Sequence, residues 1–194
     1  MTRSTIPLLL GLLLSILWVV PAHAAVSCSL NDPDRDVRKQ FPSSTGYRTE
    51  FHALGTEGGA TYRTTFEKLY GRALDTYTEI EVQHAFYPVL KGKTLIGYLY
   101  GATQKGHYGT LQVIAVVDTK GAIQTNYFQK ISAPYAAQLK DPAFTKQFAG
   151  LTLADFKGWQ TDPAYTGKLK GITSPTPEAA TDVTETLWGL KKVL

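Results

Sequence analysis

Four strand-like runs between residues 77 and 129 constrain the fold of this chain more than any other feature. In the first run, Ile80, Val82, His84 and Phe86 fall on one side of an alternating pattern, which is typical of a strand with two different faces. The later runs span 94–102, 110–117 and 122–129. Turn-forming residues lie at 91–93 and 118–121, and a glycine-rich loop is expected at 101–109. Four consecutive strands with short connections predict an antiparallel sheet.

Helical and irregular segments flank these runs. The run 110–117 is apolar on both faces, as expected of a central strand. We expect a helix at 31–40, a strand at 47–54, and helices at 133–140 and 141–150. Segment 61–74 fits either a helix or a strand. The pattern predicts an α+β fold, in which an antiparallel sheet of about four to six strands carries helices on one face or end.

The last stretch, residues 170–194, joins a hydroxyl-rich loop to an amphipathic helix that should complete the core. Thr176 suits the N-cap, Pro177 the first helical position and Glu178 the first turn. Open backbone N–H groups at a helix start can hold a phosphate. Thr176 is therefore either an ordinary cap or the point where a phosphate-bearing cofactor is held. The apolar residues that recur at helical spacing are Val183, Leu187, Leu190 and Leu194.

The N-terminus reads as a secretory signal over residues 1–24, with Arg3 before an apolar run and a small-residue cleavage site before Ala25. We expect a periplasmic or extracytoplasmic protein with a flexible segment at 25–35 and one domain at 36–194. Cys28, the only cysteine, excludes an internal disulfide. The alternatives are a lipid anchor at Cys28 and a retained N-terminal membrane anchor.

The charge, the histidine spacing and the sequence motifs provide little evidence for catalysis or nucleic-acid binding. The net charge of +4 comes from dispersed basic residues, so the chain lacks the basic block with interleaved aromatics that marks a nucleic-acid groove, and no nucleic-acid partner is expected. His52, His84 and His107 are far apart in sequence and lack the spacing of a helical metal site. His84 is expected to be a core histidine. No nucleophile elbow or phosphate-binding glycine loop is present, which ranks a small hydrolase last.

Two segments suggest a binding site. Gly106–Gly109, with His107 and Tyr108 between the glycines, combines flexible backbone with an aromatic ring that either covers a planar ligand or joins the core. The hydroxyls of Thr173, Ser174 and Thr176 could serve a phosphate.

From about residue 36 to the end, the chain resembles the FMN-binding domain family, which includes flavin-carrying subunits of the sodium-pumping NADH:quinone reductase and of the Rnf complex, and the NosR extracytoplasmic domain. Stretch 92–98 resembles the family's entry hairpin, and 106–123 its glycine-aromatic-glycine loop with the strand, Asp-x-x-Gly turn and strand that follow. Segment 141–150 resembles the next helix. Residues 172–176, Ile-Thr-Ser-Pro-Thr, stand where the family has its Ser/Thr-Gly-Ala-Thr motif.

The resemblance implies FMN held through its phosphate, in many members as a phosphoester that a flavin transferase attaches to the motif's last threonine, here Thr176. It further implies that Tyr108, with His107 and Gly109, covers or edges the ring, and that Thr173 and Ser174 help to hold the phosphate. Such a protein carries electrons for a membrane redox complex or for periplasmic carriers, and electron transfer needs no general base.

The chain also departs from the family pattern. Ser174-Pro175 replaces Gly-Ala, and proline fixes φ and removes a donor. The second hypothesis is therefore a degenerate FMN-binding-like domain without flavin, which serves as an accessory or protein-interaction module.

Overall fold

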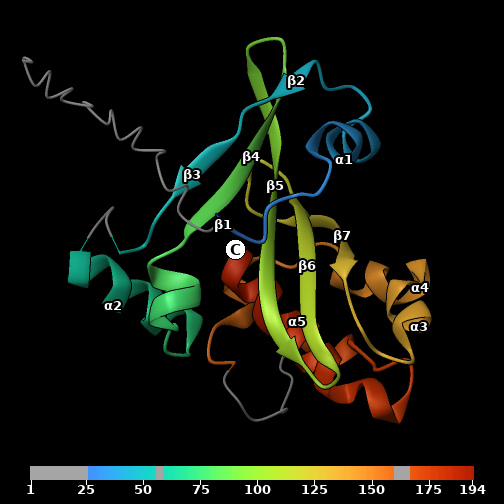
Figure 1. The fold of residues 1–194 in the computed structure, drawn as a ribbon. Coiled ribbons are helices and arrows are strands. Elements are labelled where there is room, and N and C mark those ends of the chain that lie inside the picture. The colour runs from blue at the N-terminus through green and yellow to red at the C-terminus, as the bar shows by residue number, and fades with distance from the viewer. Residues whose placement is uncertain (1–25, 56–58, 160–166) are drawn as a thin grey trace, which may run out of the picture.

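Four long antiparallel strands form the centre of the computed structural model, which describes residues 26–55, 59–159 and 167–194 (Figure 1). The expected secretory signal at 1–24 lies outside these residues. Each long strand pairs with the next in sequence, so that Phe86 lies opposite Tyr100 and Gly106 opposite Gly109. The α+β class and the antiparallel sheet are confirmed. The strands are β4 (Gln83–Lys91), β5 (Thr94–Gly106), β6 (Gly109–Val117) and β7 (Ile123–Lys130).

Three short strands add to β4. β2 (Gly46–Tyr47) and β3 (Glu50–His52) pair with it in antiparallel fashion, and β1 (Val26–Ser27) in parallel. The single strand expected at 47–54 is thus broken in two. The segment expected to be a flexible lead-in instead lies on the sheet, because Cys28 and Leu30 are buried in the core and Asp32 caps the helix that follows.

Five helices complete the described part of the chain. The ambiguous stretch near residue 61 is helical, and the segment predicted at 141–150 is a short helix continued by a 3₁₀ turn, Lys146–Phe148. A further 3₁₀ turn, Pro177–Ala179, leads into the last helix. The helices are α1 (Pro33–Gln40), α2 (Gly59–Tyr70), α3 (Ala136–Lys140), α4 (Pro142–Thr145) and α5 (Ala180–Val193).

Two hydrophobic clusters hold these elements on the sheet. The larger one joins α5 to β5 and β6, and Val183, Leu187 and Leu190 are buried there as the helical spacing predicted. At Gly189 the helix approaches the sheet so closely that a Cβ would lie 2.7 Å from Val113. The smaller cluster packs Val37 and other residues of the α1 region against the sheet.

Two predictions about the strands were wrong. Residues Thr76–Ile80 form a π-helical turn, and β4 begins only at Gln83, because the Glu79 carboxylate turns back and accepts the backbone N–H of Asp75 at 2.8 Å. The glycine-rich stretch 101–109 is mostly strand, since β5 continues to Gly106. Gly101 serves close packing there, because a Cβ would lie 2.6 Å from Cys28 Sγ.

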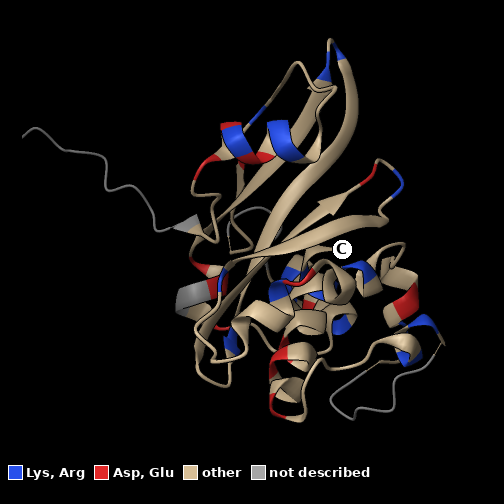
Figure 2. Ribbon diagram, turned by 90° about the vertical axis from the view of Figure 1, so that its right-hand side faces the viewer, with Lys and Arg blue, Asp and Glu red and all other residues tan. Residues whose placement is uncertain are grey.

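The surface carries its charges on many elements. Lys and Arg residues are spread over the ribbon in Figure 2 and do not gather on one face. Within the described ranges, every helix is too short or too polar to cross a membrane.

Candidate functional site

The β5–β6 hairpin ends in a turn of two residues, His107 and Tyr108, between the paired glycines 106 and 109. Gly109 has φ +121°, a backbone conformation that side chains with a Cβ rarely adopt. The turn lies beside the start of α5 at one end of the molecule (Figure 1). The hairpin therefore brings the predicted aromatic segment to the first turn of α5 at Asp182, six residues after Thr176.

Asp182, in the first turn of α5, joins the two segments. Its carboxylate accepts the backbone N–H of His107 at 2.6 Å and the hydroxyl of Tyr135 at 3.0 Å, and its side chain is buried. Burial, followed by the bond to Asp182, raises the pKa of Tyr135 to about 12. Gly106 leaves room for this arrangement, because a Cβ there would lie 2.6 Å from Asp182 Oδ1.

Tyr108 presents an accessible aromatic surface. Its side chain is 49% exposed, and its ring meets that of Tyr135 edge-on at a centroid distance of 5.8 Å. The ring of His107 lies 4.6 Å from it in the same kind of arrangement. The alternative in which Tyr108 belongs to the core is wrong, and the ring is available to a planar partner.

The hydroxyl-rich loop makes different contacts. Thr173 exchanges hydrogen bonds with the side chain of Gln147, at 2.7 Å from its N–H and 3.3 Å to its carbonyl. Ser174 Oγ donates to the carbonyl of Thr176 at 2.5 Å. These two predicted phosphate ligands are thus already bonded within the protein, and the side chain of Thr173 faces α4 and its 3₁₀ extension.

Thr176 is at the N-cap of the 3₁₀ turn that leads into α5, as predicted, with extended backbone at φ −142° and ψ 155°. Its side chain makes no capping hydrogen bond, and its Oγ1 is buried without a partner in the part of the chain that is described. A threonine at this position normally accepts a backbone N–H, which is worth about 1 kcal/mol. A buried hydroxyl without a partner costs about 1–3 kcal/mol. The residue is therefore not explained by capping.

A polar groove of about 600 Å³ opens beside the hairpin and reaches Gly109. It follows β5 and β6 past Thr103 and Gln112, and its far end is bordered by Glu79 and Lys192. The volume is within the range of small-molecule sites. Of the predicted site residues the lining includes Gly109 alone, and His107, Tyr108, Thr173, Ser174 and Thr176 lie outside it.

The residues fit a phosphate ester better than a free phosphate. Thr176 supplies an unused hydroxyl, but Pro177 has no N–H to offer, and the first turns carry the carboxylates of Glu178 and Asp182. Negative side chains at a helix start compete with an anionic ligand for its N–H groups. Attachment through Thr176 would also require its side chain to turn outward, because the oxygen is now covered.

Sequence reasoning did not identify Asp182, Tyr135 or Gln147 as part of this region. The only signal for Asp182 was a carboxylate at the position before Val183, next to the apolar face of the last helix. His84 is buried with two hydrogen-bond partners, so the prediction of a core histidine is confirmed.

Neither similarity to known proteins nor a group of metal-binding side chains in the described residues assigns a function to this site. No family model matches the chain, and no curated protein matches it. Across the residues that the structure describes, no three His, Cys, Asp or Glu side chains come together as a metal site.

Proposed function

We propose that this chain is an exported FMN-binding protein that carries electrons within a membrane-associated redox chain. The flavin would be attached through its phosphate at Thr176, with Tyr108 at the ring. The family resemblance of residues 36–194 supports the proposal, and so does the fold, in which the hairpin tip and the start of α5 lie together.

The observation that carries the proposal is the unused hydroxyl of Thr176. This oxygen neither caps its helix nor meets another described polar group, although it is buried. A threonine in that state is explained if the oxygen is destined for a bond to phosphorus. Valine, with nearly the same shape, would otherwise avoid the cost of the unpaired hydroxyl.

Bound FMN would supply one- and two-electron chemistry. The protein would position the flavin. Asp182 fixes the hairpin through the N–H of His107, and the exposed ring of Tyr108 would cover one part of the flavin. Partners would be a membrane redox complex or soluble periplasmic carriers, with a flavin transferase for loading.

The test is to express residues 25–194 together with a flavin transferase and to measure visible absorbance and intact mass. We expect one FMN, attached as an ester, in the unmodified chain and none in Thr176→Val. Thr173→Val is the matched control, because this threonine shares the loop but bonds to Gln147, and it should keep the flavin. Flavin retained in Thr176→Val would contradict attachment at this residue.

A second candidate is a flavin-free accessory domain of the same fold. The buried position of Thr176 Oγ1 and the carboxylates of Glu178 and Asp182 near the helix start favour it. Absence of flavin from the co-expressed protein, in every form, would establish this candidate over the first.

A further inference from the structure

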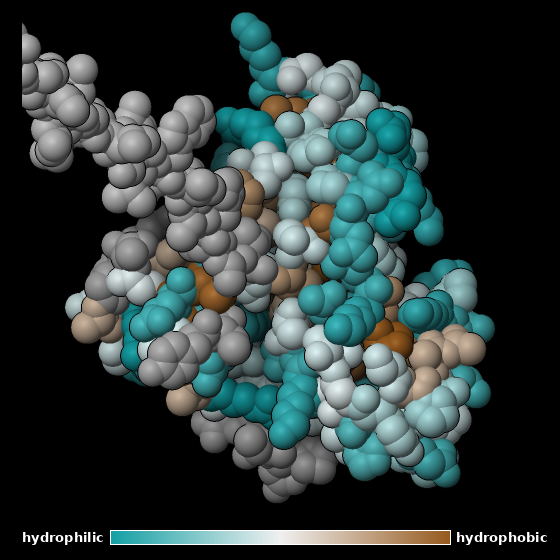
Figure 3. Space-filling model, viewed as in Figure 1, coloured by the Kyte–Doolittle hydropathy of each residue, from teal (hydrophilic) through white to brown (hydrophobic). Residues whose placement is uncertain are grey.

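The other end of α5 borders a cavity that the proposed flavin site does not use. Its volume is about 340 Å³, and its lining comes from β3, α2, the paired strands β4 and β5, and the end of α5. Asp182 at the hairpin end and Lys192 at the cavity are ten residues apart on α5, which corresponds to about 15 Å along the helix axis. Hydrophobic surface between α2 and strands β3 and β4 is visible in Figure 3.

Aromatic rings line this cavity on two sides. On the sheet, Phe86 and Tyr100 face each other across β4 and β5 and stack at a centroid distance of 4.0 Å, with 18° between the planes. His52 meets Phe86 edge-on at 5.2 Å. Tyr62 and Phe66 of α2 also line the cavity.

The cavity is not a filled part of the core. Tyr62 is 48% exposed although it borders an apolar hollow. Aromatic surface that stays in water forgoes the favourable free energy of burial. A ligand that covered these rings would recover part of that free energy.

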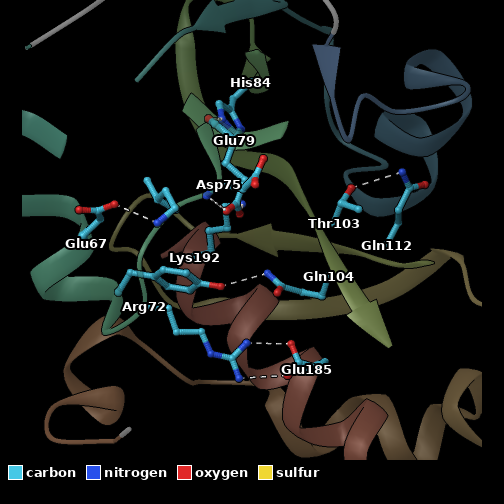
Figure 4. A network of polar contacts seen from close by, with 12 residues as sticks. Glu67, Arg72, Asp75, Glu79, His84, Thr103, Gln104, Gln112, Glu185 and Lys192 are labelled. Carbon is cyan, nitrogen blue, oxygen red and sulfur yellow. Dashed lines mark hydrogen bonds and ion pairs between the residues drawn. The ribbon is translucent and has the colours of Figure 1, made fainter. Parts of the chain in front are cut away.

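The acidic, basic and histidine side chains that line the hollow already have partners. His84 Nε2 lies 2.6 Å from the carbonyl of Glu79, and the Tyr100 hydroxyl lies 3.1 Å from His84 Nδ1. Lys192 forms an ion pair with Glu79 (Figure 4). Glu50 lies 3.4 Å from Arg48 and 3.7 Å from His52.

This pairing indicates an uncharged ligand. A charged molecule would have to give up its hydration in an apolar hollow without gaining a new counter-ion. The stacked and edge-on rings favour a flat aromatic molecule, because aromatic pairs attract one another beyond the effect of area burial. The volume is at the lower end of the range for small-molecule sites, which limits the ligand to a small ring system.

We infer that the cavity between α2 and strands β3–β5 binds a small, uncharged, planar aromatic molecule of one or two fused rings. The site is distinct from the hairpin end and does not depend on flavin there. Its lining residues central to recognition are Tyr62, Phe66, Phe86 and Tyr100.

Titration calorimetry and NMR with 1-naphthol as the probe would test this inference on residues 25–194. We expect saturable binding, with shifts confined to resonances of the cavity. Tyr62→Ala should weaken the affinity about three- to tenfold, which is the loss of one aromatic contact. The matched control is Leu69→Ala, an exposed residue of the same helix outside this lining, and it should bind as the unmodified chain does.

Two further probes separate the claims. Decahydro-1-naphthol, which is similar in size but not flat or aromatic, and 1-naphthoate, which is charged, should both bind more weakly than 1-naphthol. Equal affinity for either probe, unchanged affinity in Tyr62→Ala, or no binding of 1-naphthol would overturn the inference. Thr176→Val should bind the probe normally, so a failure here is distinguishable from a failure of flavin attachment.

Discussion

The carboxylate of Asp182 lies 2.6 Å from the backbone nitrogen of His107, and this contact joins the start of α5 to the tip of the β5–β6 hairpin. Because the two residues are 75 positions apart in sequence, the bond fixes the place where the two predicted binding segments meet. The same carboxylate accepts the Tyr135 hydroxyl, so one buried side chain orients three separate segments.

Replacing Asp182 by alanine should destabilise the fold by about 2–4 kcal/mol, because the N–H of His107 and the buried hydroxyl of Tyr135 lose their acceptor. Urea unfolding monitored by circular dichroism gives this value. Glu178→Ala, an exposed carboxylate near the same helix start, is the control and should cost less than about 1 kcal/mol. Equal effects of the two substitutions would show that helix charge, and not the buried bonds, sets the stability.

Gly106→Ala should displace the hairpin tip, since the new methyl group would lie 2.6 Å from Asp182 Oδ1. Overpacking of this kind costs about 1–3 kcal/mol. Amide chemical shifts of His107 and Tyr108 report the displacement. Gly46→Ala, in a strand where nothing lies within 4 Å of the added atom, should leave those shifts unchanged.

Glu79→Ala should be strongly destabilising, by about 3–5 kcal/mol, because it leaves the ammonium of Lys192 unpaired in a side chain that is 2% exposed. Lys192→Met removes the charge and keeps most of the side-chain volume, so this variant should lose less stability than Glu79→Ala. Chemical denaturation of both variants measures the difference. As a surface comparison, Arg63→Ala breaks the more exposed pair with Glu67 and should cost at most about 1 kcal/mol. A larger loss in Lys192→Met than in Glu79→Ala would contradict the argument.

Stability should fall as the pH drops below the usual pKa of histidine, about 6.5, because burial lowers the pKa of His84 in the folded chain. The unfolded state then binds the proton at a higher pH than the folded state. The stabilisation that neutral His84 gives to the fold is therefore fully present above about pH 6.5. It is lost as the pH falls through the lowered pKa of His84 in the folded chain. Urea midpoints between neutral and acidic pH test this. In His84→Gln the decline over that window should be shallower, and an unchanged slope would refute the assignment.

Local sequence patterns predicted the four long strands of the sheet and the last helix, because alternation and helical spacing record which faces are buried. They failed at Thr76–Ile80, where alternation continued but the Glu79 carboxylate stabilised a π-helical turn. They also mistook the end of β5 for a loop. Gly101 stands in that strand because Cys28 and Ile114 leave no space for a side chain, which is a property of packing and not of the strand itself.

The candidate site was predictable only in part. Thr176 and Tyr108 were identified from local chemistry, and their positions at an N-cap and at an exposed hairpin tip agree with it. The aromatic cavity was not foreseen, because its walls combine β3, α2, β4 and β5 with the end of α5, which is far from them in sequence. Lys192 is buried against Glu79, 113 positions away, although nothing in its neighbourhood in the sequence marks it as buried.

By itself, then, the sequence determined the α+β class, the order of the strands and the amphipathic last helix, since each depends on which residues avoid water within a short window. Tertiary structure alone decided that Asp182 would hold the hairpin, that Thr176 Oγ1 would be covered, and that Lys192 would meet Glu79. These relationships depend on contacts between segments that are far apart in sequence, and such contacts form only when the sheet and α5 have packed together.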